Sequence, residues 1–467
     1  MDQTLQHYSA EIERLARRLG LDYYTVDFDI VPASLMTEIA VYGLPVRMPH
    51  WSFGVRYIHQ LVRQTMGHSR IFEVMFPGDP CQAYLTDGNT LAENTLVTAH
   101  VLGHADFAKR NALFGRFHAM AGANIIDLAA AHARRIEQAI AEVGIARVEA
   151  VLDAALALES HVDIDQDLHR ALYPTLPPER SVPATDAFRE RYARLPDAPA
   201  PAPVPIVERL AVPPRPEWDL LWFIATYGPE LAQWEREVFL AVRAESMYFY
   251  PLFACQIMNE GWASYWHARL LREADFLPQD LYVSAIKAHS DVVRPFAADE
   301  QTALALNPYH LGFALWENIV ERHGLERAWA VCRDEDDFGF IRNHLDHDLA
   351  ERIGLFAFIA RDDGEIRVNS RDVSDIREAI LAPKYNYGAP RVAVTEMKPD
   401  GTLGLIHDHA SDGRGLDRQR ATGARIRASR MAPAGAPEQR GRAGHGARIE
   451  RVRTRCAAPL DRPRHLR

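Results

Sequence analysis

Apolar residues recur at helical spacing along much of this 467-residue chain. In residues 4–20, Leu5, Tyr8, Ile12 and Leu15 fall near a 3.6-residue period, which is typical of a helix with one buried face. A second helix should begin at Thr90, because Thr90 and Glu93 have the spacing of a capping box. Similar patterns predict helices at about 120–142, 146–160, 218–227, 230–250, 255–272, 280–292, 309–323 and 338–350.

Extended segments are few and short. Residues 69–85 read as two strands joined by a turn at 77–80, and residues 355–359, 365–369 and 391–397 read as one small antiparallel sheet. Residues 42–53 are rich in Pro, Gly and aromatic residues, which predicts an ordered, aromatic-packed loop. The predicted fold class is therefore α+β and predominantly α-helical, a multi-helix core with small antiparallel β elements near residues 69–85 and 355–397.

Proline separates the helical segments. Residues 171–216 hold twelve of the 29 prolines, which predicts a linker or an extended excursion. This gives an N-terminal helical segment at 1–170, a second helical segment at 217–334 and a small α+β segment at 335–410.

Composition places the chain among ordinary globular proteins, with 48% hydrophobic and 25% charged residues. No apolar run is long enough for a membrane span, and the N-terminus lacks the pattern of a secretory signal. The four cysteines are scattered without a C-x-x-C pair, as expected of reduced thiols in the cytoplasm. The sequence also lacks a phosphate-binding glycine motif and a G-x-S-x-G elbow, which disfavours nucleotide hydrolysis and serine esterase chemistry.

The last 57 residues differ from the rest. Residues 411–467 contain fifteen Arg against five acidic residues and no Lys, Phe, Tyr or Trp, whereas residues 1–410 carry a net charge of −20. The acidic body disfavours broad nucleic-acid binding. Two explanations fit the tail: a disordered basic segment that binds nucleic acid, or the frame-shifted translation of a GC-rich gene.

Two short segments contain residues of the types that commonly bind metals. His100 and His104 are four residues apart, so both imidazoles project from one face of a helix. Glu260 and His267 form a second stripe on the helix predicted at 255–272. Two histidines from one helix and a carboxylate or histidine from another are a common zinc site, so we predict a divalent metal, of the zinc type, at these four residues. The alternative is a set of buried or solvated histidines without metal.

Position 101 limits the comparison with zinc hydrolases. The helical zinc hydrolase motif has its general base directly after the first histidine, and this chain has Val101 there. Glu245 and Glu73 are the alternative bases, although neither lies in a motif and both are also explained as surface or pairing carboxylates. The residues expected to line a pocket around the metal are Arg47, His50, Trp51, Asp106, Asn111, Asn259 and Trp262.

Five stretches are distinctive enough to compare with known families. They are residues 42–54 (YGLPVRMPHWSFG), 100–111 (HVLGHADFAKRN), 258–267 (MNEGWASYWH), 307–312 (NPYHLG) and 340–343 (FIRN). Together they resemble the SpoVR family, named after stage V sporulation protein R, and the resemblance runs from about residue 5 to about residue 410.

The resemblance implies a role in forming the spore cortex, or a stress function in bacteria that do not sporulate. It also implies partners, a PrkA-type serine kinase and a von Willebrand-like protein. The two stripes of predicted metal ligands lead us to expect a cytoplasmic, metal-dependent hydrolase-like protein, and the link to the spore cortex is consistent with a peptide or a cell-wall precursor as its substrate. The alternative is a non-catalytic interaction protein that works with the kinase.

Overall fold

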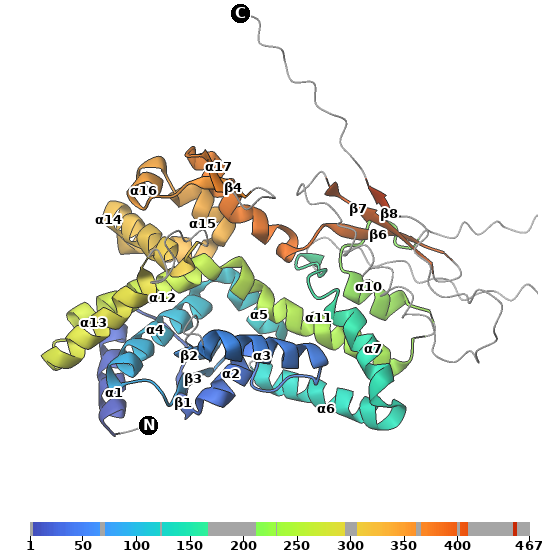
Figure 1. Cartoon of the computed structure of the whole chain (residues 1–467), viewed down its shortest axis with the longest axis horizontal. Helices are drawn as coiled ribbons and strands as arrows, with labels where there is room; N and C mark the ends of the chain where they lie inside the picture. Colours follow the sequence, from blue (N-terminus) through green and yellow to red (C-terminus); the bar gives the residue numbers. More distant parts are fainter. Residues whose placement is uncertain are drawn as a thin grey trace, which may run out of the picture. The chain divides into compact units, whose positions relative to one another are not determined.

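The computed structural model describes residues 3–65, 71–121, 124–166, 212–229, 231–294, 306–360, 366–398, 402–409 and 452–454 (Figure 1). Helices dominate these residues and the strands form only small sheets, which confirms the predicted helical α+β class. No helix in these ranges combines the length and apolarity that crossing a membrane requires.

The chain divides into two compact units. The first comprises Met1–Val162 and Ile224–Ala389, and the second comprises Asp163–Phe223 and Pro390–Arg467. The helices of the first unit are α1 (Gln3–Arg18), α2 (Ala33–Tyr42), α3 (Trp51–Thr65), α4 (Leu91–Arg110), α5 (Ala112–Ala121), α6 (Ile125–Val143), α7 (Ile145–Leu156), α11 (Gln233–Ala254), α12 (Gln256–Glu273), α13 (Gln279–Val293), α14 (Pro308–Asp334), α15 (Asp337–His344), α16 (His347–Arg352), α17 (Val373–Leu381) and the 3-10 helix η1 (Ala382–Gly388). Helix α10 (Leu220–Tyr227) runs across the boundary between the units.

Helix α12 is the centre of the first unit and packs against α4 and α14. Its fully buried Trp262 and Trp266 join Trp316 of α14 in one aromatic cluster. Glycines allow the close approach on both sides of α12. A Cβ added at Gly103 of α4 would lie 2.7 Å from Ala263 Cα, and one added at Gly261 would lie 2.3 Å from the carbonyl carbon of Gly312 in α14.

A three-stranded sheet lies beside α4. Strand β3 (Cys81–Thr86) pairs antiparallel with β2 (Glu73–Phe76), as the sequence predicts for residues 69–85. It also pairs in parallel with β1 (Val26–Val31), which was not predicted from the sequence. On the α4 side, Ala83 and Leu85 pack against Val97 and Val101 in a small apolar cluster. The sheet thereby brings the start of β2 close to the middle of α4.

The predicted single sheet after residue 335 is wrong. Strands β4 (Ala357–Ala360) and β5 (Ile366–Ser370) form one antiparallel pair in the first unit. Strands β6 (Val392–Met397) and β7 (Leu403–His407) belong to a separate sheet in the second unit. The reason is local, because α17 and η1 intervene between β5 and β6, and Asp372 starts α17 by accepting a hydrogen bond from Ser374 N.

One further expectation needs correction. The predicted loop at 42–53 ends earlier, because Trp51 is already the first residue of α3. In the tail, Val452–Thr454 are described and form strand β8, which pairs in parallel with β7. The rest of 411–467 and nearly all of the predicted Pro-rich linker lie outside the described residues.

Candidate metal centre

Helix α4 is fixed at its start and turned so that its histidines face α12. Thr90 Oγ1 accepts a hydrogen bond from Glu93 N at 3.2 Å and Glu93 Oε2 accepts one from Thr90 N at 2.7 Å, which is the capping box that the sequence predicts. His100 and His104, one turn apart, then lie side by side with ring centroids 4.5 Å apart. Val101 packs in the apolar cluster against β3 instead.

Glu260 of α12 meets both histidines. Its Oε2 atom lies 3.5 Å from Nε2 of His104 and 3.8 Å from Nε2 of His100. The same oxygen is buried and has no hydrogen-bond partner among the described residues. Burial by itself would raise the pKa of Glu260, but the adjacent His104 and His100 outweigh it and hold that pKa below its ordinary value. The structure therefore brings an ionised carboxylate to two imidazole nitrogens.

The tautomer of His104 is set by Asn259. Nδ1 of His104 lies 2.9 Å from Oδ1 of Asn259, and this oxygen can only accept, so Nδ1 donates its proton. Burial, followed by the neighbouring His100, lowers the pKa of His104 to about 4, which keeps the ring neutral. A neutral ring protonated on Nδ1 points the lone pair of Nε2 at the Glu260 carboxylate.

Two more side chains complete the cluster. Glu73 at the start of β2 places Oε1 3.8 Å from Nε2 of His100, and the donor atoms of Glu73, His100 and His104 all lie within 4.8 Å of one another. Burial raises the pKa of Glu73, His100 opposes the rise and Glu260 adds to it. Tyr309 of α14 stacks on His100 with ring centroids 6.1 Å apart, and the nearby Glu260 charge together with burial raises the pKa of Tyr309 well above its ordinary value of 10.

His267 lies behind the centre. Its Nδ1 is 2.9 Å from Nδ1 of His100, and its Nε2 is 2.5 Å from Nδ1 of His289 on α13. Both ring nitrogens of His267 are therefore engaged by other histidines. Glu260 and not His267 is the α12 residue that faces Nε2 of both α4 histidines.

The buried imidazoles make stability depend on pH. Burial first, then Arg272 and His100, lower the pKa of His289 to about 4, whereas an unfolded chain protonates this residue near 6.5. Between pH 7 and pH 5 the unfolded state therefore gains a proton that the folded state does not, and the folded state loses stability. We expect His289→Asn to gain in urea midpoint relative to the parent as pH falls from 7 to 5, measured in the presence of a chelator. A difference between the two proteins that does not change with pH would contradict this expectation.

Three of the predicted pocket residues hold the helices together. Asp106 is fully buried and accepts hydrogen bonds from Asp22 N, Arg110 Nε and Trp262 Nε1. Asn111 donates to the carbonyl oxygens of Cys332 and Glu335 at the end of α14. Their contacts account for these residues without a ligand, whereas Asn259 acts directly on His104.

The remaining predicted residues form other pairs. Arg47 Nε lies 2.7 Å from Oε2 of the fully buried Glu245, which also lies 3.4 Å from His132. His50 Nε2 and Trp51 Nε1 both bond Asp153 Oδ1. No contact described in the structure links these residues to His100 or His104, so of the two candidate bases only Glu73 lies at the centre.

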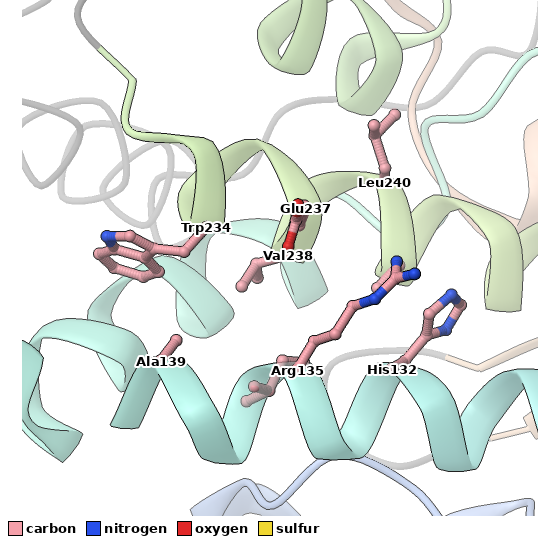
Figure 2. A pocket seen from close by; sticks show the side chains of 9 residues that line it. His132, Arg135, Ala139, Trp234, Glu237, Val238 and Leu240 are labelled. Atoms are coloured by element: carbon pink, nitrogen blue, oxygen red, sulfur yellow. The ribbon is translucent and has the colours of Figure 1, made fainter. Parts of the chain in front are cut away.

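A pocket of about 110 Å³ lies elsewhere, between α6 and α11 (Figure 2). It shares no lining residue with the histidine cluster, and His132 is the lining residue that reaches Glu245. The lining residues are His132, Arg135, Ile136, Ala139, Trp234, Glu237, Val238, Leu240 and Ala241.

Two residues of the cluster, Tyr309 and His289, were not predicted from the sequence. Tyr309 lies in the 307–312 stretch that carries part of the family resemblance, which was an available signal. His289 lies on α13 in no such stretch, and only the packing of α13 against α4 and α12 brings it to His267.

Comparison with known proteins agrees with the sequence resemblance. The family described as "SpoVR like protein" matches residues 1–389. The chain is 30% identical over 351 residues to a protein of Escherichia coli (strain K12) named "Uncharacterized protein YcgB". This match covers 72% of the chain and 66% of the relative, just under two thirds of its length. No solved structure matches the chain.

Proposed function

The chain belongs to the family of SpoVR-like proteins, and from this premise we propose that it binds one divalent metal ion of the zinc type and uses it for hydrolysis. The ligands in this proposal are His100 Nε2, His104 Nε2 and Glu260 Oε2. All three belong to the stretches by which the chain resembles the family.

The unpaired oxygen of Glu260 is the observation that carries the proposal. A buried carboxylate oxygen without a hydrogen bond is costly, and here it faces the lone pair of His104 Nε2 at 3.5 Å. A cation between these atoms would convert the repulsion into attraction. Metal–ligand distances of about 2.0–2.2 Å in a tetrahedral site separate the ligand atoms by about 3.3–3.6 Å. The separation of 3.5 Å between Glu260 and His104 lies within this range, and that of 3.8 Å between Glu260 and His100 is slightly longer.

Glu260 is a better ligand than Glu73. Oε2 of Glu260 approaches both histidines, and its pKa is lowered, so it carries the negative charge that a metal requires. The pKa of Glu73 is raised by burial, which favours a carboxyl group that exchanges a proton nearer neutral pH. We therefore assign Glu260 to metal binding and Glu73 to proton transfer.

A zinc ion bound here would acidify a bound water and polarise a substrate carbonyl. Glu73 Oε1, beside His100, would accept the proton that the general base of the helical motif accepts in other hydrolases. Tyr309 stays protonated at neutral pH beside the Glu260 carboxylate. Asn259 orients His104 by accepting the hydrogen bond from its Nδ1.

The substrate and the cellular role are extensions of the same proposal. The family resemblance favours a peptide or a cell-wall precursor in the cytoplasm, in sporulation or in stress physiology. The second candidate function is a non-catalytic interaction protein that works with a PrkA-type serine kinase. Val101 favours this second function, because it removes the usual base from the helical motif.

Metal binding by the purified chain tests the proposal. After chelation and addition of zinc, we expect one bound ion per chain, and we expect His100→Ala combined with His104→Ala to abolish its binding. His118→Ala on α5 is the matched control, because His118 stacks on Tyr24 instead and should leave zinc binding unchanged. Failure of the parent chain to bind any divalent metal stoichiometrically would overturn the proposal.

The two glutamates then separate metal binding from hydrolysis. Glu260→Gln should weaken zinc binding by more than the roughly 10–100-fold typical of partners that only orient a ligand, because it removes the charged ligand itself. Glu73→Gln should retain zinc and lose hydrolysis of peptide and cell-wall substrates. Retained zinc and no hydrolysis by the parent chain would support the second function instead.

A further inference from the structure

Three histidine side chains form a line of successive contacts that starts at the proposed metal centre. His100 of α4 contacts His267 of α12 through Nδ1 atoms 2.9 Å apart, and His267 contacts His289 of α13 at 2.5 Å. The rings of His267 and His289 stand nearly perpendicular, at 89°. His267 is 1% exposed and His289 is half-buried, so the line runs from the core toward the surface of α13.

The hydrogen bonds of this line must share one direction. A neutral imidazole has one donor and one acceptor nitrogen, and His267 uses both. If His267 donates from Nε2 to His289, its Nδ1 accepts the proton of His100, and Nε2 of His100 is left with a free lone pair. If the direction is reversed, His100 carries its proton on Nε2 and cannot bind a metal there. The protonation of His100 is therefore tied to that of His289, two rings away.

The proposed metal centre requires the first direction, because His100 Nε2 can bind a metal only while the proton of His100 stays on Nδ1 and is donated to His267. Phe313 packs against His289 at 5.4 Å between ring centroids and holds the ring in place. His289 can then serve as a fixed acceptor for Nε2 of His267.

We propose that His289 is a positioning residue that acts through His267 to keep the proton of His100 on Nδ1 and the lone pair of Nε2 directed at the metal site. This inference rests on the proposed metal centre, and it adds a residue of a third helix, α13, that does not itself bind the metal. Partners that orient a metal-binding histidine typically change metal affinity by about 10–100-fold.

The test compares two substitutions of the same residue. His289→Phe keeps a ring of similar size beside Phe313 and removes the acceptor, whereas His289→Asn keeps an acceptor oxygen near the position of Nδ1. We expect His289→Phe to weaken zinc binding, measured by competition with a chelator, by about 10–100-fold. His289→Asn should stay within about threefold of the parent. Equal zinc affinity in His289→Phe and the parent would overturn the proposal, as would equal losses in both variants.

A second measurement keeps the inference separate from the proposed function. Nitrogen-15 chemical shifts of metal-free protein report which nitrogen of His100 is protonated. We expect Nδ1 to be protonated in the parent and in His289→Asn, and a larger share of Nε2 protonation in His289→Phe. If the parent binds no zinc but shows this change, the proposed function fails and the coupling between the histidines stands. An unchanged protonation of His100 in His289→Phe would disprove the coupling.

Discussion

Gly261→Ala is expected to destabilise the first unit by about 3 kcal/mol or more, at the upper end of the cost of overpacking a core. A Cβ at this position would lie 2.3 Å from the carbonyl carbon of Gly312, and one at Gly312 would lie 2.2 Å from Ile257 O. These neighbours are backbone atoms, so only a separation of α12 from α14 relieves the clash. The urea midpoint should fall sharply, and zinc binding should weaken because Glu260 precedes Gly261 directly.

Gly115→Ala on α5 is the matched control. No atom lies within 4 Å of a Cβ added there, and alanine favours a helix over glycine by up to about 1 kcal/mol. This variant should be as stable as the parent or more so. Equal midpoints for Gly261→Ala and Gly115→Ala would show that α12 and α14 are not in such close backbone contact.

Asp337→Ala is expected to cost about 3–5 kcal/mol, the range for breaking a buried ion pair. Asp337 is fully buried and accepts hydrogen bonds from Ile257 N and Met258 N at the start of α12, at 3.0 and 2.9 Å. It also lies 3.0 Å from Nζ of the buried Lys384. The substitution leaves two amides and an ammonium group without this acceptor.

A double variant identifies the cause of that loss. Burial outweighs Lys384 and the amides and raises the pKa of Asp337 to about 6, so the pair does not fully recover its desolvation cost. Asp337→Ala combined with Lys384→Met should therefore be more stable than Asp337→Ala alone, by urea denaturation. A double variant that loses the sum of both single losses would argue against an unpaired charge as the cause.

The sequence predicted the features that depend on local spacing. Residues four apart on a helix share a face, so the spacing of His100 and His104 is sufficient to pair them. The capping box at Thr90 is local in the same way. The convergence of α4 and α12 was inferred from residue types alone, and the structure places Glu260 between both histidines.

Long-range packing determined what the sequence could not show. Glu73 reaches His100 because β2 pairs with β3 and β3 packs on α4, and no motif around Glu73 records this. Glu245 was the other candidate base without a supporting motif, but in the structure it pairs with Arg47, 198 residues away. The strands after residue 335 looked alike in sequence, and the helices between β5 and β6 divide them into two sheets.

The orientation of Val101 has a consequence for protein engineering and for motif searches. The turn of α4 that aims His100 and His104 at Glu260 aims position 101 at Ala83 and Leu85 of the sheet. The substitution Val101→Glu would restore the usual sequence of the helical zinc motif. It would also bury an unpaired carboxylate among apolar side chains. A sequence search for similar metal centres should therefore not require a glutamate after the first helical histidine. It should instead require the two histidines, a glutamate on a later helix and a carboxylate on an earlier strand.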